Sequence, residues 1–496
     1  HQSSRRTISS WRRAAMVALA TTTLLAGCSA SAADNGTIAG STPTSTAATA
    51  GLYDDSVVHD IEVTVDPDDY AELVAAYQQS SEKVWIEATV VIDGITYEQV
   101  GLRLKGNSSL MSLSGRGVGG AGGVGGGNFA GIDEACLIDV GTGNASTASL
   151  ADSPETLPWL IRLDKFVEDQ QHEGVTEFVV RSNNFATSIN EAVALELLAE
   201  AGLATQEATA ARFAFNGSDA ELRLVIENPT EEWVATQFDE AGTDAIGQLY
   251  KAESSGDWSY RGDDPADYEE VWDQEAGEDD LTPLTDFLQF VNESTDEAFA
   301  AELADRLDVQ AFARYLAIED LMGNFDDIAG PGNNSYLYFD PDTGLATVVA
   351  WDHNLAFSGG LDGQPGGGQQ MPPGGGFPPG QGGMPMELPE GCELPTDMGP
   401  GNLPSFDPAN APAGGPGGGP MGGSNVLVER FNAVPEFAEL YDAAVAELTE
   451  TLFADGTADT ILQRWVTLLT EQATDLVGSD VVESDAQSVR DAFPTD

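Results

Sequence analysis

The residues best suited to chemistry lie in the segment 323–357, GNFDDIAGPGNNSYLYFDPDTGLATVVAWDHNLAF. Two adjacent acids, Asp326 and Asp327, are followed by the amide Asn334 and, after two strand-like runs, by Asp352. Phosphoryl transfer needs such groups: an Asp and an Asn hold Mg²⁺ against the phosphates, and another carboxylate orients or deprotonates the attacking hydroxyl. The segment can supply all three, with Asp326 as the preferred catalytic carboxylate and Asp327 as the alternative.

A β-hairpin is expected to position these groups. The runs SYLYF and ATVVAW are typical of strands, and the sequence DPDTG at 340–344 is typical of a turn. We interpret 340–344 as a turn rather than a Ca²⁺ loop, because too few further oxygen ligands lie at loop spacing. Asp352 follows the second strand, where a lone Asp can also be a helix N-cap. Its place after Asp326 and Asn334, which is the order of catalytic groups in protein kinases, favours a metal ligand.

Composition limits the kinds of partner. The chain of 496 residues has 20 Lys and Arg against 82 Asp and Glu, and its formal net charge is −62. Such a surface repels nucleic acid and anionic membranes. The acids are scattered, as in a solvated exterior. We therefore expect binding to depend on local clusters, and we expect no nucleic-acid partner.

The first 50 residues have the pattern of an export signal followed by a tether. Basic residues precede an apolar run at 14–25 that is too short to span a bilayer. The run ends in LAGC, which resembles the lipobox of bacterial lipoproteins. This implies a signal peptide at 1–27, lipid attachment to Cys28 and an extracytoplasmic location at the cell membrane, whereas ordinary secretory cleavage is the alternative. The Ser/Thr/Ala-rich residues 28–50 would form a tether.

The two other cysteines are Cys136 and Cys392. Both lie in loop-like inserts, and in an oxidising compartment two remaining cysteines often pair. An intramolecular disulfide between them is therefore plausible. A catalytic thiol is disfavoured because no histidine lies near either cysteine in the sequence.

The rest of the chain changes from β-rich to α-rich. Helical patterns occupy 281–323 and return at 425–490. Two segments, the Gly-rich 114–148 and the Gly/Pro-rich 358–424, have almost no periodicity, and the second is expected to be a long loop or a disordered insert. The order predicts an α+β fold with a β-rich N-terminal lobe, an α-rich C-terminal lobe and a nucleotide in the cleft between them.

Several further motifs occur in a fixed order around the segment 323–357: GLRLKGNSS (101–109), LIRLDKF (160–166), GQLYKAE (247–253) and FNAVPEFAELY (431–441). Together with GNFDDIAGPGNNSYLYFDPDTG and VVAWDHNLAFSG, they resemble the CotH family of atypical, secreted or spore-coat kinases. The resemblance implies a divergent protein-kinase-like domain at 51–357, completed by the helices of 425–490. It also implies binding of ATP and Mg²⁺ (or Mn²⁺) and phosphorylation of Ser or Thr hydroxyls of a protein.

Carried over by position, the resemblance makes Asp326 the catalytic residue and Asn334 and Asp352 the metal ligands. The family often has an acidic or amide residue two places after the last of these. Here it is Asn354, which keeps an oxygen ligand but lacks a charge. Lys251 lies in a matched motif and would be an active-site cation, with a surface ion pair as the alternative.

Other residues are candidates for nucleotide binding. In the sequence GNSS at 106–109, Asn107 and Ser108 can help to cradle phosphates while Arg103 or Lys105 neutralises charge. A plain turn at a strand end is the alternative.

Arg181 and Glu191 can form the cation–carboxylate pair that positions phosphates, although Glu191 also has capping-box spacing from Ser188. Glu227, at a strand end, is placed as a hinge residue would be to meet the base. The glycines at 115–120 match a nucleotide loop only formally, because no strand directly precedes them and no helix follows.

Two other functions stay open. One is a non-catalytic structural or adhesion protein of the cell envelope built on the same fold. The other is AMP transfer with the nucleotide bound in the reverse orientation. The kinase interpretation expects a protein substrate, and membrane contact only through the lipid on Cys28.

Overall fold

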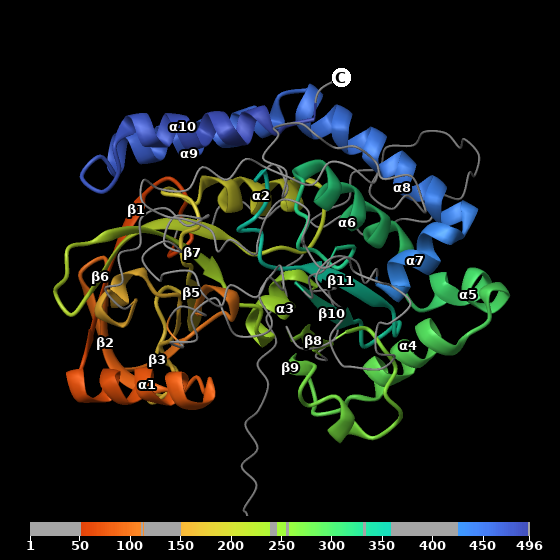
Figure 1. Cartoon of the computed structure of the whole chain (residues 1–496), viewed down its shortest axis with the longest axis horizontal. Coiled ribbons are helices and arrows are strands. Elements are labelled where there is room, and N and C mark those ends of the chain that lie inside the picture. Colours follow the sequence, from red (N-terminus) through yellow and green to blue (C-terminus); the bar gives the residue numbers. More distant parts are fainter. Residues whose placement is uncertain are drawn as a thin grey trace, which may run out of the picture. The chain divides into compact units, whose positions relative to one another are not determined.

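Seven strands in the first half of the chain close into a β-barrel (Figure 1). Around the barrel they follow the order β1-β2-β3-β4-β5-β7-β6, and only the closing pair, β1 with β6, is parallel. Buried and exposed residues alternate along β1, because successive side chains of a strand point to opposite faces. The strands are Val58–Val65 (β1), Ile86–Ile92 (β2), Ile95–Leu104 (β3), Trp159–Arg162 (β4), Glu177–Val180 (β5), Ala208–Phe215 (β6) and Glu221–Glu227 (β7).

The computed structural model describes residues 51–110, 113, 150–238, 246–253, 257–330, 334–358 and 425–494. The signal peptide at 1–27, Cys28 and the tether at 28–50 lie outside the described residues. So do the insert 114–148 with Cys136, and the insert 358–424 with Cys392, apart from Ser358.

A second sheet has the strand order β11-β10-β8-β9 and is antiparallel throughout. Its strands are Gln248–Ala252 (β8), Trp272–Ala276 (β9), Ser335–Phe339 (β10) and Ala346–Ala350 (β11). The predicted hairpin is β10–β11. Asp340 shapes its turn, since Asp340 Oδ1 accepts hydrogen bonds from the N–H groups of Asp342 and Thr343 at 2.9 and 2.6 Å. The turn interpretation of 340–344 is confirmed.

Helices surround the two sheets. They are Pro67–Ser80 (α1), Ile189–Glu200 (α2), Glu231–Gln237 (α3), Thr282–Glu293 (α4), Asp296–Glu302 (α5), Val309–Met322 (α6), Val426–Ala433 (α7), Pro435–Leu448 (α8), Thr457–Gln472 (α9) and Ser479–Asp491 (α10). Helix α2 is buried on nearly all sides, because β6 covers one face while α6, α9 and α10 cover others. None of the described helices is long and apolar enough to cross a bilayer.

The predicted α+β class is confirmed, with strands dominating the first half and helices the second. The closed barrel differs from the expected two-lobed layout, since a kinase N-terminal lobe is not ordinarily a closed seven-stranded barrel. The barrel closes because β1 pairs in parallel with β6, from Val58 opposite Ala210 to Val63 opposite Phe215. That pairing joins residues about 150 positions apart, so no local sequence pattern predicts that the barrel closes.

The helices after the second insert belong to the main core. Phe431 of α7 is fully buried, and its ring lies 4.9 Å from that of Phe312 in α6 and 5.0 Å from that of Phe437 in α8. This aromatic group joins segments on either side of residues 359–424.

We expect Phe431→Ala to lower the free energy of unfolding by about 3–5 kcal/mol, because it removes a buried ring and leaves a cavity. Phe166→Ala is the matched control, since Phe166 is 47% exposed and its loss should change stability by less than about 0.5 kcal/mol. Guanidinium denaturation of both variants measures the difference. Equal costs would show that α7 is not part of the core.

Candidate active site

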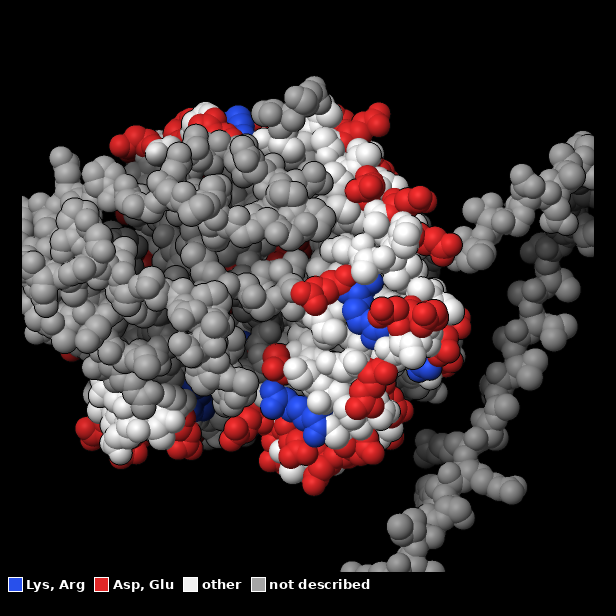
Figure 2. Space-filling model, turned by 45° about the vertical axis from the view of Figure 1, so that its right-hand side comes forward, with Lys and Arg blue, Asp and Glu red and all other residues white. Residues whose placement is uncertain are grey.

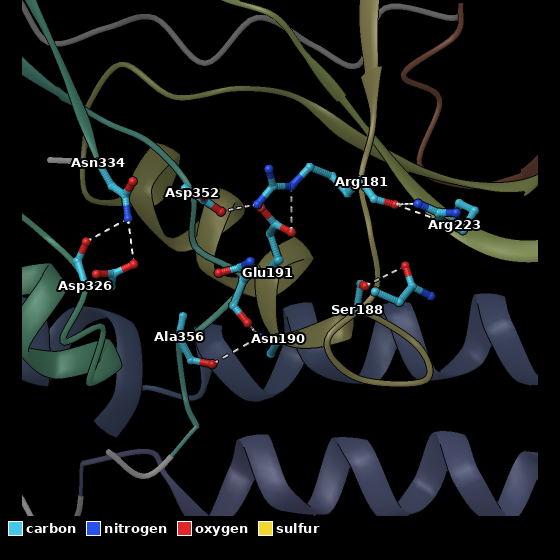
Figure 3. A network of polar contacts seen from close by, with 11 residues as sticks. Arg181, Ser188, Asn190, Glu191, Arg223, Asp326, Asn334, Asp352 and Ala356 are labelled. Atoms are coloured by element: carbon cyan, nitrogen blue, oxygen red, sulfur yellow. Dashed lines mark hydrogen bonds and ion pairs between the residues drawn. The ribbon is translucent and has the colours of Figure 1, made fainter. Parts of the chain in front are cut away.

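The site forms where the end of β11 meets the barrel and α2 (Figure 3). Asp352 follows β11 with φ of +66°, a left-handed conformation that is uncommon outside glycine. Its Oδ1 accepts a hydrogen bond from Nη2 of Arg181, which directly follows β5. This ion pair thus links the barrel to the second sheet.

Arg181 also pairs with Glu191 of α2, at 3.1 Å from Nε to Oε2 and 2.8 Å from Nη2 to Oε1. Burial alone would lower the pKa of Arg181, but the charges of Asp352 and Glu191 outweigh it and raise that pKa. The capping box does not form: Ser188 makes no cap hydrogen bond and instead donates to Asn183 Oδ1 at 3.0 Å. The structure therefore brings Arg181 and Glu191 together as the cation–carboxylate pair.

Asp326 and Asn334 form a second contact of the site. The amide of Asn334 donates to the backbone oxygen of Asp326 at 2.8 Å and to its Oδ2 at 3.0 Å. The amide oxygen of Asn334 then points away from Asp326 (Figure 3). Burial and the charge of Asp352 raise the pKa of Asp326, although the hydrogen bond from Asn334 acts against the rise.

Asp327 points elsewhere. Its Oδ1 accepts hydrogen bonds from the N–H groups of Ala329 and Gly330 at 3.1 and 2.9 Å, and the residue is 4% exposed. Burial and the charge of Glu319 raise the pKa of Asp327 to about 8. Asp327 thus holds the turn of its own loop, while Asp326 lies beside Asn334.

The donors at this point suit a divalent cation that prefers oxygen. Asn334 and Asp352 offer an amide oxygen and a carboxylate, the hard ligands that Mg²⁺ takes in phosphoryl-transfer sites, and Asp326 lies beside Asn334. The side chain of Asp352 is 27% exposed, so it is accessible. Within the described chain, no group of three or more His, Cys, Asp or Glu side chains could hold a metal ion. A metal here would use the amide oxygen and take its remaining ligands from the nucleotide or water.

The four lysines of the chain gather in one region, which we call the lysine cluster: Lys83, Lys105, Lys165 and Lys251, with Arg103 among them. Lys165 and Arg103 both stack on the ring of Trp85, each 4.8 Å from its centroid. Lys105 lies 5.7 Å from the ring of Trp351, the neighbour of Asp352. The cluster therefore borders the site.

Most of the cluster has no carboxylate partner. Lys251 pairs with Glu253 at 2.8 Å, but the other four cations form no ion pair with any described residue. Lys83 and Lys105 donate instead to the amide oxygens of Asn107 and Asn228, at 2.8 and 3.0 Å. Asp and Glu cover much of the described surface in view (Figure 2), so these unpaired cations mark a place suited to an anion.

Burial and the neighbouring cations lower the pKa of both Lys83 and Lys105 to about 8. For Lys83 the largest contribution after burial is the charge of Lys251, and the same is true for Lys105. Each lysine thus carries its charge at a cost that a bound anion would remove.

The GNSS sequence turns the chain at the end of β3. Gly106 has φ of +95°, and a Cβ there would lie 2.5 Å from Ser109 Oγ, so the turn requires glycine. Asn107 contacts Lys83, as described above, while the side chain of Ser108 is outside what the structure describes.

A family model described as CotH kinase protein matches residues 151–476. The chain belongs to the CotH kinase family. No curated protein matches it. The match covers Arg181, Glu191, Asp326, Asn334 and Asp352, so the five residues that the structure brings together lie in the part shared with the CotH family.

The side chain of Glu227, predicted as a hinge residue that meets the base, does not contact the lysine cluster. Its carboxylate accepts a hydrogen bond from the N–H of Glu207 at 2.9 Å, and burial raises its pKa to about 8. The next residue, Asn228, contacts Lys105 instead. Neither Asn228 nor Lys83 was expected from the sequence. The scarcity of lysine, four in 496 residues, is the signal that could have indicated Lys83.

We expect this site to bind tripolyphosphate more weakly as the pH rises through about 8. Lys83 and Lys105 are charged below their pKa and neutral above it, so their attraction for the anion is largely present at pH 7 and declines towards pH 9. Calorimetric titrations across that range measure it. Lys105→Met should weaken binding at pH 7 and flatten the pH dependence, whereas Arg306→Met, in an exposed ion pair with Glu302, should change neither. Binding of wild type that is constant from pH 7 to 9 would contradict the assignment.

Proposed function

We propose that this CotH-family protein is a kinase that transfers the γ-phosphoryl group of ATP to Ser or Thr hydroxyls of a protein, with Mg²⁺ or Mn²⁺. One arrangement of side chains carries the proposal. Asp352 pairs with Arg181, and its charge raises the pKa of the nearby Asp326. Asp326 in turn accepts a hydrogen bond from Asn334. Phosphoryl transfer depends on positioning and charge stabilisation by groups of this kind.

Each residue then has a chemical task. Asn334 and Asp352 would hold the metal, which would neutralise charge on the phosphates. Asp326 orients the acceptor hydroxyl and takes its proton as the oxygen attacks the γ-phosphorus and the bond to the bridging oxygen of ADP breaks. The raised pKa of Asp326 brings it closer to the operating pH, as a general base requires. Arg181, Lys105 and Lys251 offset charge on the polyphosphate.

The order of these groups supports a divergent kinase-like fold in spite of the closed barrel. A cation after β5 pairs with a carboxylate on α2, and the loop Asp, the Asn, the hairpin and the metal-binding Asp follow in sequence. We propose that the barrel with α2 acts as the N-terminal lobe and the second sheet with its helices as the C-terminal lobe.

We also propose export and lipid anchoring through Cys28, on the basis of the basic, apolar and LAGC sequence of residues 5–28. Cys28→Ser should move the protein from the membrane fraction to the soluble extracytoplasmic fraction and abolish labelling by a palmitate analogue. A Cys136→Ser variant is the matched control and should stay in the membrane fraction. An unlabelled wild type would overturn the anchor.

We expect label from γ-³²P-ATP to appear in protein Ser or Thr residues with wild type. Asp326→Asn should lower the rate about 10²–10⁴-fold, because a general base is lost, and Asp352→Asn should remove metal-dependent transfer. Asp342→Asn, an exposed acid on the β10–β11 turn, is the matched control and should leave the rate unchanged.

The same assay separates the alternatives. Incorporation of label from α-³²P-ATP in place of γ-label would show AMP transfer. No label from either nucleotide, with no rise in melting temperature on adding saturating Mg²⁺ and ATP, would indicate a non-catalytic envelope protein, because a bound ligand must stabilise the fold.

A further inference from the structure

One buried carboxylate contacts both loops of the site. Glu319 lies near the end of α6 and is 1% exposed. Its Oε1 lies 2.9 Å from Nε2 of His353, and its Oε2 accepts a hydrogen bond from Nδ2 of Asn324 at 2.8 Å. The backbone of Glu319 is engaged as well, since its oxygen accepts from the N–H of Asn324 at 3.0 Å.

Both partners stand next to proposed site residues. Asn324 precedes Asp326 by two positions, and His353 directly follows Asp352. The contact between His353 and Glu319 is fully buried, since their side chains are 0% and 2% exposed. Polar groups removed from water to this extent depend on each other as partners. A further bond from the N–H of Phe357 to the oxygen of Met322, at 2.8 Å, fixes the Asp352 loop to the end of α6.

We infer that Glu319 is a positioning residue that holds the loop 324–330 and the loop 352–357 in a fixed relation, so that Asp326 and Asp352 act on the same phosphoryl group. The inference rests on the proposed function for its catalytic consequences. A displacement of about 1 Å between reacting groups can cost about 10²-fold in rate. Asp352 in particular needs support, because its left-handed backbone persists only when the surroundings impose it.

The chain offers a matched control one residue away. Asp320 is on the same helix but is exposed, and its Oδ2 accepts a hydrogen bond from Oη of Tyr441 in α8 at 2.5 Å. Asp320→Asn and Glu319→Gln each replace a carboxylate by its amide and disturb one hydrogen-bonded group. Of these two acids, Glu319 is the one whose side chain contacts residues of both loops.

We expect Glu319→Gln to lower kcat about 10²-fold and to raise the Mg²⁺ concentration for half-maximal rate several-fold. The reason is that an amide has one oxygen, so it cannot accept from both Asn324 and His353 as the carboxylate does. The Kd for ATP should change less than about twofold. Hydrogen exchange of residues 324–330 and 352–357 should become faster. Asp320→Asn should leave the rate, the Mg²⁺ dependence and this exchange unchanged.

A second variant keeps the test decisive if Glu319→Gln does not fold. Asn324→Ala leaves the Glu319–His353 contact intact, and it should lower kcat and speed exchange in 324–330 but not in 352–357. If wild type transfers label and Glu319→Gln behaves like Asp320→Asn, the inference fails while the proposed function stands. If wild type transfers no label, the proposed function fails, and hydrogen exchange alone decides whether Glu319 holds the two loops.

Discussion

The structure depends on the charge of Arg181, which is shared between Glu191 and Asp352. Arg181 is 7% exposed and Glu191 1%, and charges removed from water to this extent are tolerated only when paired. The three residues come from the end of β5, from α2 and from the end of β11. Their pairing therefore fixes the barrel, the central helix and the second sheet relative to one another, and the proposed metal site lies at the point where they meet.

The surrounding polar contacts make this arrangement stiff. Arg223, buried in the barrel, donates from Nε to the backbone oxygen of Arg181 at 2.7 Å and from Nη2 to that of Leu157 at 2.9 Å. On the other side, the amide of Asn190 donates to the backbone oxygen of Asn354 at 3.0 Å. It also donates to that of Ala356 at 3.1 Å (Figure 3). Consecutive residues of α2 thus hold both Arg181 and the loop behind Asp352.

The sequence could predict features that depend on residues close together in the chain, but not those that depend on distant residues. The hairpin and the order of Asp326, Asn334 and Asp352 depend on local spacing, and the structure has the hairpin and places the three residues at one site. Barrel closure depends on the pairing of β1 with β6, and Asn228 meets Lys105 across 123 positions. Glu191 shows the limit most clearly: its spacing from Ser188 suggested a cap as readily as an ion pair, and only burial beside Arg181 decides between them.

The pairing of the cations gives separate information about where an anion can bind. Outside the lysine cluster, the arginines that the structure describes pair with carboxylates, apart from Arg223, which bonds to backbone oxygens. Lysine differs from arginine in that its pKa shifts readily when buried and its charge is compact. Burial makes the charges of Lys83 and Lys105 costly, and a bound anion would offset that cost. The cluster beside Trp351 thus supports the proposed binding of a polyphosphate.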